Sequence, residues 1–192
     1  MPDIVLVRHG ETEWTVSGQH TSVTDVELTD AGRRAAKALG QALAERSFEV
    51  VLTSPRRRAR ETCALAGLGE RARVVEDLAE WDYGEYEGLT TLRIRAQRPG
   101  WSLWRDGAPG GEAASEVGAR ADRVLRELGD VRGDAAVFSH GHFLRVLAAR
   151  WVGLAPEEGG LLGALAPASL GVLGRERENR VLTAWNLAGA GS

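Results

Sequence analysis

Three short apolar segments, each followed at once by polar residues or glycine and then by a helical pattern, constrain the fold of this chain most strongly. They are residues 4–7 (IVLV), 50–53 (VVLT) and 135–139 (AAVFS). Such runs are typical of strands buried on both faces, and strands that alternate with helices favour a parallel sheet. We therefore expect an α/β fold with a mostly parallel central sheet and helices on both faces.

Two long helices are predicted from apolar periodicity. One helix is expected to begin near Thr29, a good N-cap, and a second is expected over residues 112–128. The buried face of the first should carry Ala35, Leu39, Ala42 and Leu43. The buried face of the second should carry Val117, Ala121, Val124, Leu125 and Leu128. Segments 169–173 and 180–186, separated by a polar turn, predict an antiparallel hairpin at the sheet edge.

Length and charge limit what the chain can be. Its 192 residues suit one compact domain, expected to span positions 1–192, and a hydrophobic content of 43% excludes a disordered chain. The net charge of −3 has the wrong sign for a general nucleic-acid or anionic-membrane binder. No apolar stretch approaches the ~20 residues of a membrane-spanning helix, and no signal-peptide pattern is apparent. We expect neither nucleic acid nor membrane as a partner.

Cysteine and histidine usage points to a reducing compartment. The single cysteine, Cys63, cannot form an internal disulfide, and no Cys/His spacing matches a zinc site. The expected location is the cytoplasm, and no metal is expected. An exposed edge strand or apolar patch in the carboxyl-terminal third could mediate a homodimer.

Polar residues at the three strand ends identify the candidate site. Ligands of open α/β sheets bind beyond the carboxyl ends of the strands, which here carry residues 8–10 (RHG), 54–60 (SPRRRAR) and 139–142 (SHGH). An arginine and an imidazole beside a glycine, whose missing side chain lets a ligand approach the backbone, suit an oxyanion. One such tripeptide alone is more simply a solvated loop, but its recurrence at two strand ends favours a shared site.

Helical geometry separates the members of the arginine run. At about 100° per residue, Arg56 and Arg60 share one side, and Arg58 lies about 200° from Arg56. If the outer pair faces water, Arg58 points inward, where it needs a negative partner because an unpaired buried guanidinium is costly. A phosphate held by both Arg8 and Arg58 would meet that need.

Residues 78–88 (LAEWDYGEYEG) supply carboxyl groups among aromatic rings. Aromatic surroundings and a nearby phosphate dianion would both favour the protonated form, which makes such a carboxyl a proton donor near neutral pH. An aromatic core segment with surface acids explains the same composition equally well.

Taken in order, these segments resemble the histidine phosphatase superfamily, in its phosphoglycerate-mutase-like branch. The resemblance spans roughly positions 4–145. It rests on residues 6–14 (LVRHGETEW), 25–29 (DVELT) with Gly32, 53–62 (TSPRRRARET), 78–88, 110–112 (GGE) and 138–142 (FSHGH). It implies a phosphoglycerate-mutase-like fold with His9 as the phosphorylated nucleophile and Glu80 as the proton donor. Arg8, Arg58 and His140 are implied to complete the phosphate pocket.

The implied reaction is metal-independent hydrolysis of a small phosphorylated metabolite without a cofactor. Attack requires a neutral imidazole, and neighbouring guanidinium groups would lower the pKa of His9 while compensating the phosphate's charge. Glu80 would protonate the leaving alkoxide in the first step and activate water in the second. The two arginines and His140 would hold the phosphoryl oxygens throughout.

The chain departs from many relatives in one loop. Thr15 stands where they have Asn, and Gly18-Gln19 stands where they have Gly-Arg; residues 17–22 are more similar to sugar-bisphosphate and broad-specificity acid phosphatases. Besides Arg8, Arg58 and His140, substrate contacts are therefore expected at Ser17, Gln19, His20, Thr21, Gly141 and His142. A plain loop role fits the first four equally well. Trp101 and Trp104 could roof the site, but core packing is the commoner role.

Two alternatives to a hydrolase remain. One is a cofactor-dependent phosphoglycerate mutase, which has to shield its phosphohistidine from water; the family's mutases are similar to this chain but carry a longer insertion between the positions of Glu80 and His140. The other is a non-catalytic phosphate-binding regulatory module. A module that only binds phosphate has no use for a buried proton donor, so the presence of both His9 and Glu80 favours an enzyme.

Overall fold

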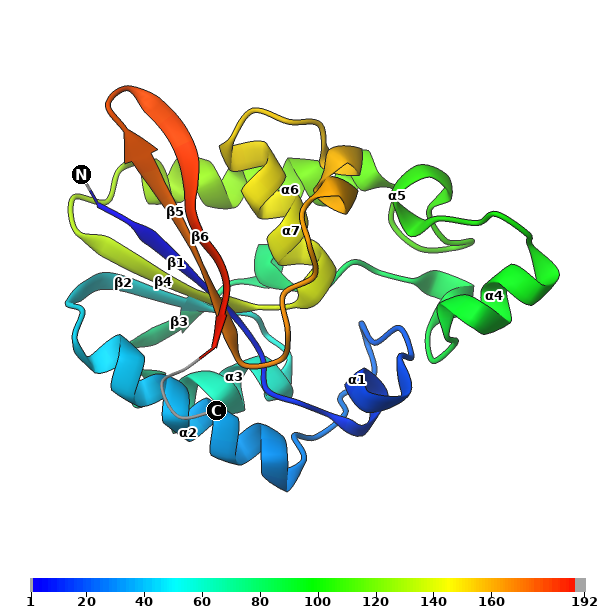
Figure 1. Ribbon diagram of the computed structural model, residues 1–192, viewed down its shortest axis with the longest axis horizontal. Coiled ribbons are helices and arrows are strands. Elements are labelled where there is room, and N and C mark those ends of the chain that lie inside the picture. The colour runs from blue at the N-terminus through cyan, green and yellow to red at the C-terminus, as the bar shows by residue number, and fades with distance from the viewer. Residues whose placement is uncertain (1, 189–192) are drawn as a thin grey trace.

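A six-stranded sheet forms the centre of the computed structural model, which describes residues 2–188 (Figure 1). Its strands are β1 (Ile4–Arg8), β2 (Phe48–Thr53), β3 (Ala72–Val74), β4 (Asp134–Ser139), β5 (Ser169–Glu176) and β6 (Asn179–Ala188). The spatial order is β3-β2-β4-β1-β5-β6. The first four pair in parallel, whereas β5 runs antiparallel to both β1 and β6. The predicted fold class and edge hairpin are confirmed; the short strand β3 was not predicted.

Helices cover both faces of this sheet, as expected. They are α1 (Glu13–Ser17), α2 (Asp30–Ala44), α3 (Arg57–Leu65), α4 (Thr91–Gln97), α5 (Leu103–Asp106), α6 (Ala114–Gly129) and α7 (Gly141–Trp151). Short 3₁₀ turns are η1 (Gly69–Arg71), η2 (Glu76–Leu78), η3 (Gly84–Tyr86) and η4 (Pro156–Leu161). Figure 1 shows α2 and α3 on one face, α6 and α7 on the other, and α1, α4 and α5 toward the end at which β1 terminates.

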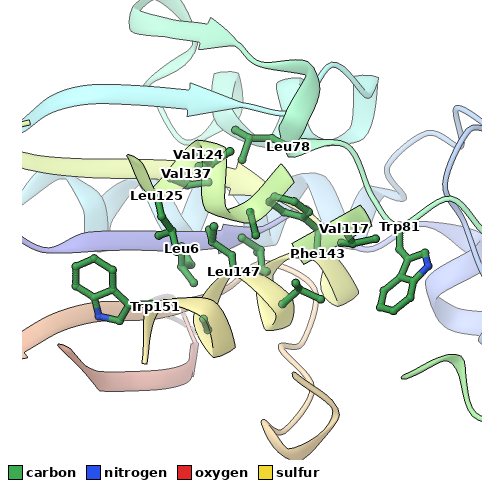
Figure 2. Packing of buried hydrophobic residues seen from close by; sticks show 14 of the residues in the cluster. Leu6, Leu78, Trp81, Val117, Val124, Leu125, Val137, Phe143, Leu147 and Trp151 are labelled. Carbon is green, nitrogen blue, oxygen red and sulfur yellow. The ribbon is translucent and has the colours of Figure 1, made fainter. Parts of the chain in front are cut away.

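Alternation along β1 divides the core into two halves. Ile4 and Leu6 belong to the cluster on the α6 and α7 side, and Val5 and Val7 belong to the cluster on the α2 and α3 side. A strand with apolar side chains on both faces can exist only where each face is covered, which is why the run reads as continuously apolar. Figure 2 shows the larger cluster, in which Leu6 lies among side chains of α6 and α7.

Helix α2 begins after the predicted cap, but its buried face differs in part from the prediction. The hydroxyl of Thr29 accepts a hydrogen bond from the backbone N–H of Gly32 at 3.0 Å, as predicted for an N-cap. The buried residues are Gly32, Ala36, Leu39 and Leu43. The expected Ala35 is exposed and Ala42 is half-buried, because the true spacing of four, three and four residues places Ala36, not Ala35, against the sheet. The predicted face of α6 is buried as expected.

Two further observations concern partners. Within the part of the chain that the structure describes, no helix combines the length and apolar character that crossing a membrane requires. Strand β6 forms one edge of the sheet and carries the half-exposed Leu187. The homodimer remains a prediction.

Truncation of Leu147 to alanine should lower the free energy of unfolding by about 2–5 kcal/mol, because it leaves a cavity in the larger core cluster. Leu147 is fully buried on α7. The matched control is Leu92→Ala on α4, whose side chain is 81% exposed and should change stability by less than about 0.5 kcal/mol. Urea unfolding measures both, and equal effects of the two substitutions would contradict this packing.

Candidate active site

A cavity of about 220 Å³ opens at the carboxyl ends of β1 and β4. It gathers residues from the end of β1, the region of α1, the segment after η2, the first turns of α7 and the segment before β5. The lining comprises Arg8, His9, Trp14, Thr15, Gly18, Gln19, His20, Thr21, Glu80, Tyr83, Thr91, Gly141, His142, Arg145, Ala164 and Leu165. Parallel strands bring these distant segments together because their carboxyl ends meet at one edge of the sheet.

His9 is fixed with one ring nitrogen bound and the other available. Its backbone N–H donates to the carbonyl of Ser139 at 3.0 Å, and its Nδ1 lies 2.8 Å from the carbonyl oxygen of Gly10. Since a carbonyl only accepts hydrogen bonds, Nδ1 carries the hydrogen and the neutral ring keeps a lone pair on Nε2. Burial lowers the pKa of His9 well below its usual value, and the charges of Arg58 and Arg8 lower it further. The imidazole is therefore neutral near pH 7, with a lone pair on Nε2.

The glycine after His9 has a different purpose from the one the sequence suggested. A Cβ on Gly10 would lie 2.7 Å from the carbonyl oxygen of Gly32, so the missing side chain admits the first turn of α2 rather than a ligand. The backbone N–H of Gly10 donates to the hydroxyl of Thr62 on α3 at 2.9 Å. This close packing holds the His9 backbone against two helices.

Arg8 enters the site across the start of α7. One terminal nitrogen donates to the carbonyl of Leu165, and its buried Nε has no hydrogen-bond partner within residues 2–188. A Cβ on Gly141 would lie 3.2 Å from the Arg8 guanidinium carbon, so this glycine gives the guanidinium its space. The guanidinium remains available to an anion in the cavity.

Arg58 points inward from α3, as helical geometry predicted, and is fully buried. We expected a negatively charged partner for Arg58, but backbone carbonyl groups accept its hydrogen bonds instead. Its terminal nitrogens donate to the carbonyls of Thr21, Ser22 and Thr24 at 3.0–3.2 Å. Carbonyl dipoles satisfy a buried guanidinium without cancelling its charge. Arg58 does not line the cavity, yet its positive charge acts on both His9 and His140.

His140 follows β4 and lies beside His9, with 5.2 Å between the ring centroids. It is fully buried, and burial followed by the charge of Arg58 lowers its pKa well below the usual value. Its Nε2 lies 2.7 Å from the hydroxyl oxygen of Ser54, at the end of β2. Three strand ends thus converge at these two rings, as the sequence predicted.

Glu80 is held by backbone N–H groups at the start of α7. Its Oε1 accepts from Phe143 at 2.8 Å and from Trp81 at 2.9 Å, and its Oε2 accepts from His142 at 3.1 Å. A carboxylate suits a helix N-terminus, where amides have no intrahelical partner and the helix dipole is positive. The sequence predicted a carboxyl group among aromatic rings with a phosphate dianion nearby. The structure adds three backbone N–H donors, which no pattern within residues 78–88 indicated.

The predicted substrate-contact residues are distributed unevenly. Gln19, His20, Thr21, Gly141 and His142 line the cavity. Ser17 is exposed on α1, outside the lining, and its hydroxyl donates to the side chain of Gln19 at 2.6 Å. Arg58 and His140 are buried behind the cavity wall rather than in it.

The sequence reasoning missed Arg145, a cation in the cavity wall. It lies one helical turn after Gly141 on α7, and residues four apart on a helix share a face. Extending the candidate segment 139–142 by one turn would therefore have included it. Its guanidinium lies 4.5 Å from the centre of the Trp104 ring and donates to the carbonyls of Gly159 and Gly160. No carboxylate pairs with it among the ion pairs of residues 2–188.

Aromatic side chains surround the imidazoles of His20 and His142 in the cavity lining. Tyr83 lies with its hydroxyl 2.7 Å from Nδ1 of His142, and the Trp104 ring meets His142 edge to face. Trp101 is buried against His20. The two tryptophans therefore pack as core, as expected, but directly behind the site histidines. Burial lowers the pKa of His142 well below its usual value.

Fold and site together define an α/β phosphatase. The chain belongs to the histidine phosphatase superfamily, because the model of that superfamily's branch 1 matches residues 4–188. The expected family and enzyme class are thereby confirmed.

Individual relatives agree with this result. The chain is 45% identical over 190 residues to an acid phosphatase of Mycobacterium tuberculosis, covering 97% of this chain and 93% of that protein. It is 36% identical to sedoheptulose 1,7-bisphosphatase of Saccharomyces cerevisiae, covering 80% of this chain and 68% of that protein. It is also 36% identical to a 2,3-bisphosphoglycerate-dependent phosphoglycerate mutase of Brucella melitensis, covering 81% of this chain and 84% of that protein. A solved M. tuberculosis structure superposes with a TM-score of 0.93 at 44% identity, covering 98% of both chains.

The buried histidines should make stability depend on pH. His9, His140 and His142 have lowered pKa values when folded, whereas the unfolded chain binds protons near pH 6.5. As pH falls below about 6.5 the unfolded state takes up protons that the folded state refuses, so the free energy of unfolding falls. Each such histidine contributes up to about 1.4 kcal/mol per pH unit.

Urea unfolding between pH 7 and pH 5 measures this slope. In His142→Asn, whose amide oxygen can still accept from Tyr83, the slope should be shallower than in the unchanged protein. Stability that rises as pH falls through this window, or an identical slope in the variant, would contradict the burial of neutral imidazoles.

Proposed function

We propose that the protein hydrolyses a phosphomonoester of a small metabolite without a metal ion, through a phosphohistidine at His9. The observation that carries the proposal is the state of that ring: it is 4% exposed, lines the cavity, is kept neutral by burial and by the charges of Arg58 and Arg8, and has its hydrogen fixed on Nδ1 by Gly10. A neutral imidazole that presents a lone pair beside guanidinium groups suits attack on a phosphate dianion.

In the first step, the lone pair on Nε2 of His9 attacks phosphorus. The ester P–O bond breaks, and the leaving oxygen takes a proton from the carboxyl group of Glu80, which lines the same cavity. Glu80 is left as a carboxylate, the form that the N–H groups of Trp81, His142 and Phe143 stabilise.

In the second step, the Glu80 carboxylate takes a proton from water while the water oxygen bonds to phosphorus. The bond between phosphorus and Nε2 breaks, so His9 returns to its neutral form and inorganic phosphate leaves. Arg8 compensates phosphoryl charge from the cavity lining, and Arg58, which lies outside the lining, does so through the charge that it exerts at His9. Both steps use only groups of this chain and water.

The substrate is proposed to carry a second anionic group, bound by Arg145. This guanidinium lines the cavity, is held by backbone carbonyls and aromatic stacking, and lacks a carboxylate partner within the described residues. Relatives support this class, since they include a sedoheptulose 1,7-bisphosphatase and, at 30% identity, a glucosyl-3-phosphoglycerate phosphatase of Mycolicibacterium vanbaalenii. Both names describe sugar-derived substrates with a further acidic group.

A mutase is the second candidate, because bacterial phosphoglycerate mutases are 36% identical to this chain. A mutase would return the phosphoryl group to a reoriented acid and would require water to be excluded. The test is isomerisation of 3-phosphoglycerate in the presence of 2,3-bisphosphoglycerate, measured against release of inorganic phosphate. We expect phosphate release to predominate; isomerisation faster than hydrolysis would replace the proposal.

His9→Ala should lower hydrolysis of p-nitrophenyl phosphate by at least about a thousandfold, because it removes the nucleophile. The assay contains EDTA, in which the unchanged enzyme should stay fully active. Nitrophenol release that survives the substitution would eliminate His9 as the nucleophile, and strict dependence on added divalent metal would indicate another chemistry.

Arg145→Ala should lower kcat/KM for a sugar bisphosphate or a phosphorylated sugar acid by roughly ten- to a hundredfold, the usual loss for a charged hydrogen bond. The same variant should hydrolyse p-nitrophenyl phosphate, which has no second anion, within about threefold of the unchanged enzyme. Steady-state kinetics on both substrates decides the point. A similar loss on both would mean that Arg145 acts on the reacting phosphate or on the fold instead.

A further inference from the structure

The hydroxyl of Ser54 is buried between two partners. Its oxygen accepts from the backbone N–H of Arg56 at 3.2 Å and lies 2.7 Å from Nε2 of His140. Ser54 and His140 are both fully buried. Within residues 2–188, His140 Nε2 is the one hydrogen-bond acceptor within reach of the Ser54 hydroxyl hydrogen. The hydroxyl therefore donates to Nε2, which holds a lone pair.

The other ring nitrogen of His140 must then carry the hydrogen. The ring is neutral because burial and the charge of Arg58 lower the pKa of His140 well below the usual value. A neutral imidazole has one hydrogen, and with Nε2 accepting it resides on Nδ1. Nδ1 is buried and has no hydrogen-bond partner in the part of the chain that the structure describes.

We propose that Ser54 is a positioning residue that holds His140 in the tautomer with hydrogen on Nδ1, so that this N–H donates to the phosphoryl group carried by His9. The inference rests on the proposed function, because the phosphoryl group is the acceptor. The two rings lie 5.2 Å apart, so a group bonded to His9 is close to His140. The opposite tautomer would turn a lone pair toward the phosphoryl oxygens and leave the Ser54 hydroxyl hydrogen without an acceptor.

The two catalytic histidines would then be set in complementary ways. In His9, the carbonyl of Gly10 holds the hydrogen on Nδ1 and leaves a lone pair on Nε2 for attack. In His140, a hydroxyl donor at Nε2 leaves an N–H to bind the transferred group. The carbonyl of Gly10 thus makes His9 the nucleophile, and the hydroxyl of Ser54 makes His140 a donor to the phosphoryl oxygens.

Nitrogen-15 NMR of the imidazole rings tests the tautomer directly, because protonated and unprotonated ring nitrogens have distinct resonances. In the unchanged protein at neutral pH, His140 should show a protonated Nδ1 and an unprotonated Nε2. Addition of inorganic phosphate should shift the Nδ1 resonance more than the Nε2 resonance. A proton found on Nε2, or a larger phosphate effect at Nε2, would overturn the inference.

Ser54→Ala should convert His140 to a mixture of tautomers and lower kcat by roughly ten- to a hundredfold, with a smaller change in KM. The matched control is Thr53→Val, which removes the neighbouring buried hydroxyl on β2, one that contacts the carbonyl of Ser54 and does not contact His140. Thr53→Val should keep the His140 tautomer and a kcat within about threefold. A Ser54→Ala enzyme with unchanged tautomer and unchanged kcat would refute the positioning role.

The outcomes separate this inference from the proposed function. Hydrolysis that depends on His9 in a protein whose His140 carries its proton on Nε2 would refute the role of Ser54 alone. Loss of dependence on His9 would refute the proposed function itself, whatever the tautomer of His140.

Discussion

Burial of the neutral His9 imidazole beside two guanidinium groups is the constraint on which the rest of the site depends. A cation in the same place would face the desolvation penalty and the repulsion of Arg58 and Arg8, so the ring remains uncharged. The same charges become favourable when a phosphate dianion arrives. The free protein thus keeps the positive charges of Arg58 and Arg8 close to a neutral ring, and the proposed phosphate dianion would compensate those charges.

The scaffold supplies this arrangement through its sheet. Arg8 and His9 lie at the end of β1, Ser54 follows β2, and His140 follows β4. The site therefore forms only when the connections between these parallel strands have placed β2, β4 and β1 side by side. The start of α7 then holds Glu80 through amides that have no partner within the helix. The core clusters pack against the two faces of the sheet, and Figure 2 shows the side that contains Leu6, Phe143 and Leu147.

Much of this arrangement could be predicted from the sequence, because apolar runs and their polar ends are local patterns. The parallel sheet, the cap at Thr29 and the inward direction of Arg58 follow from periodicity and are confirmed. The rest depends on contacts between distant segments. The backbone of Gly32 leaves no room for a side chain at position 10, and the carbonyls of Thr21, Ser22 and Thr24 accept from Arg58. Glu80 accepts from the backbone of α7. None of these contacts has a pattern within one segment. Strand β3 was not predicted because its three residues are too few to form a recognisable pattern.

The most direct measurement of the central claim is the protonation state of His9 in the free enzyme, followed by NMR of its ring nitrogens from pH 8 to pH 5. The account predicts that His9 stays neutral, with hydrogen on Nδ1 and a lone pair on Nε2, at pH values where an ordinary histidine with a pKa near 6.5 becomes charged. A ring that takes up its second proton at pH 6.5 or above would contradict the account.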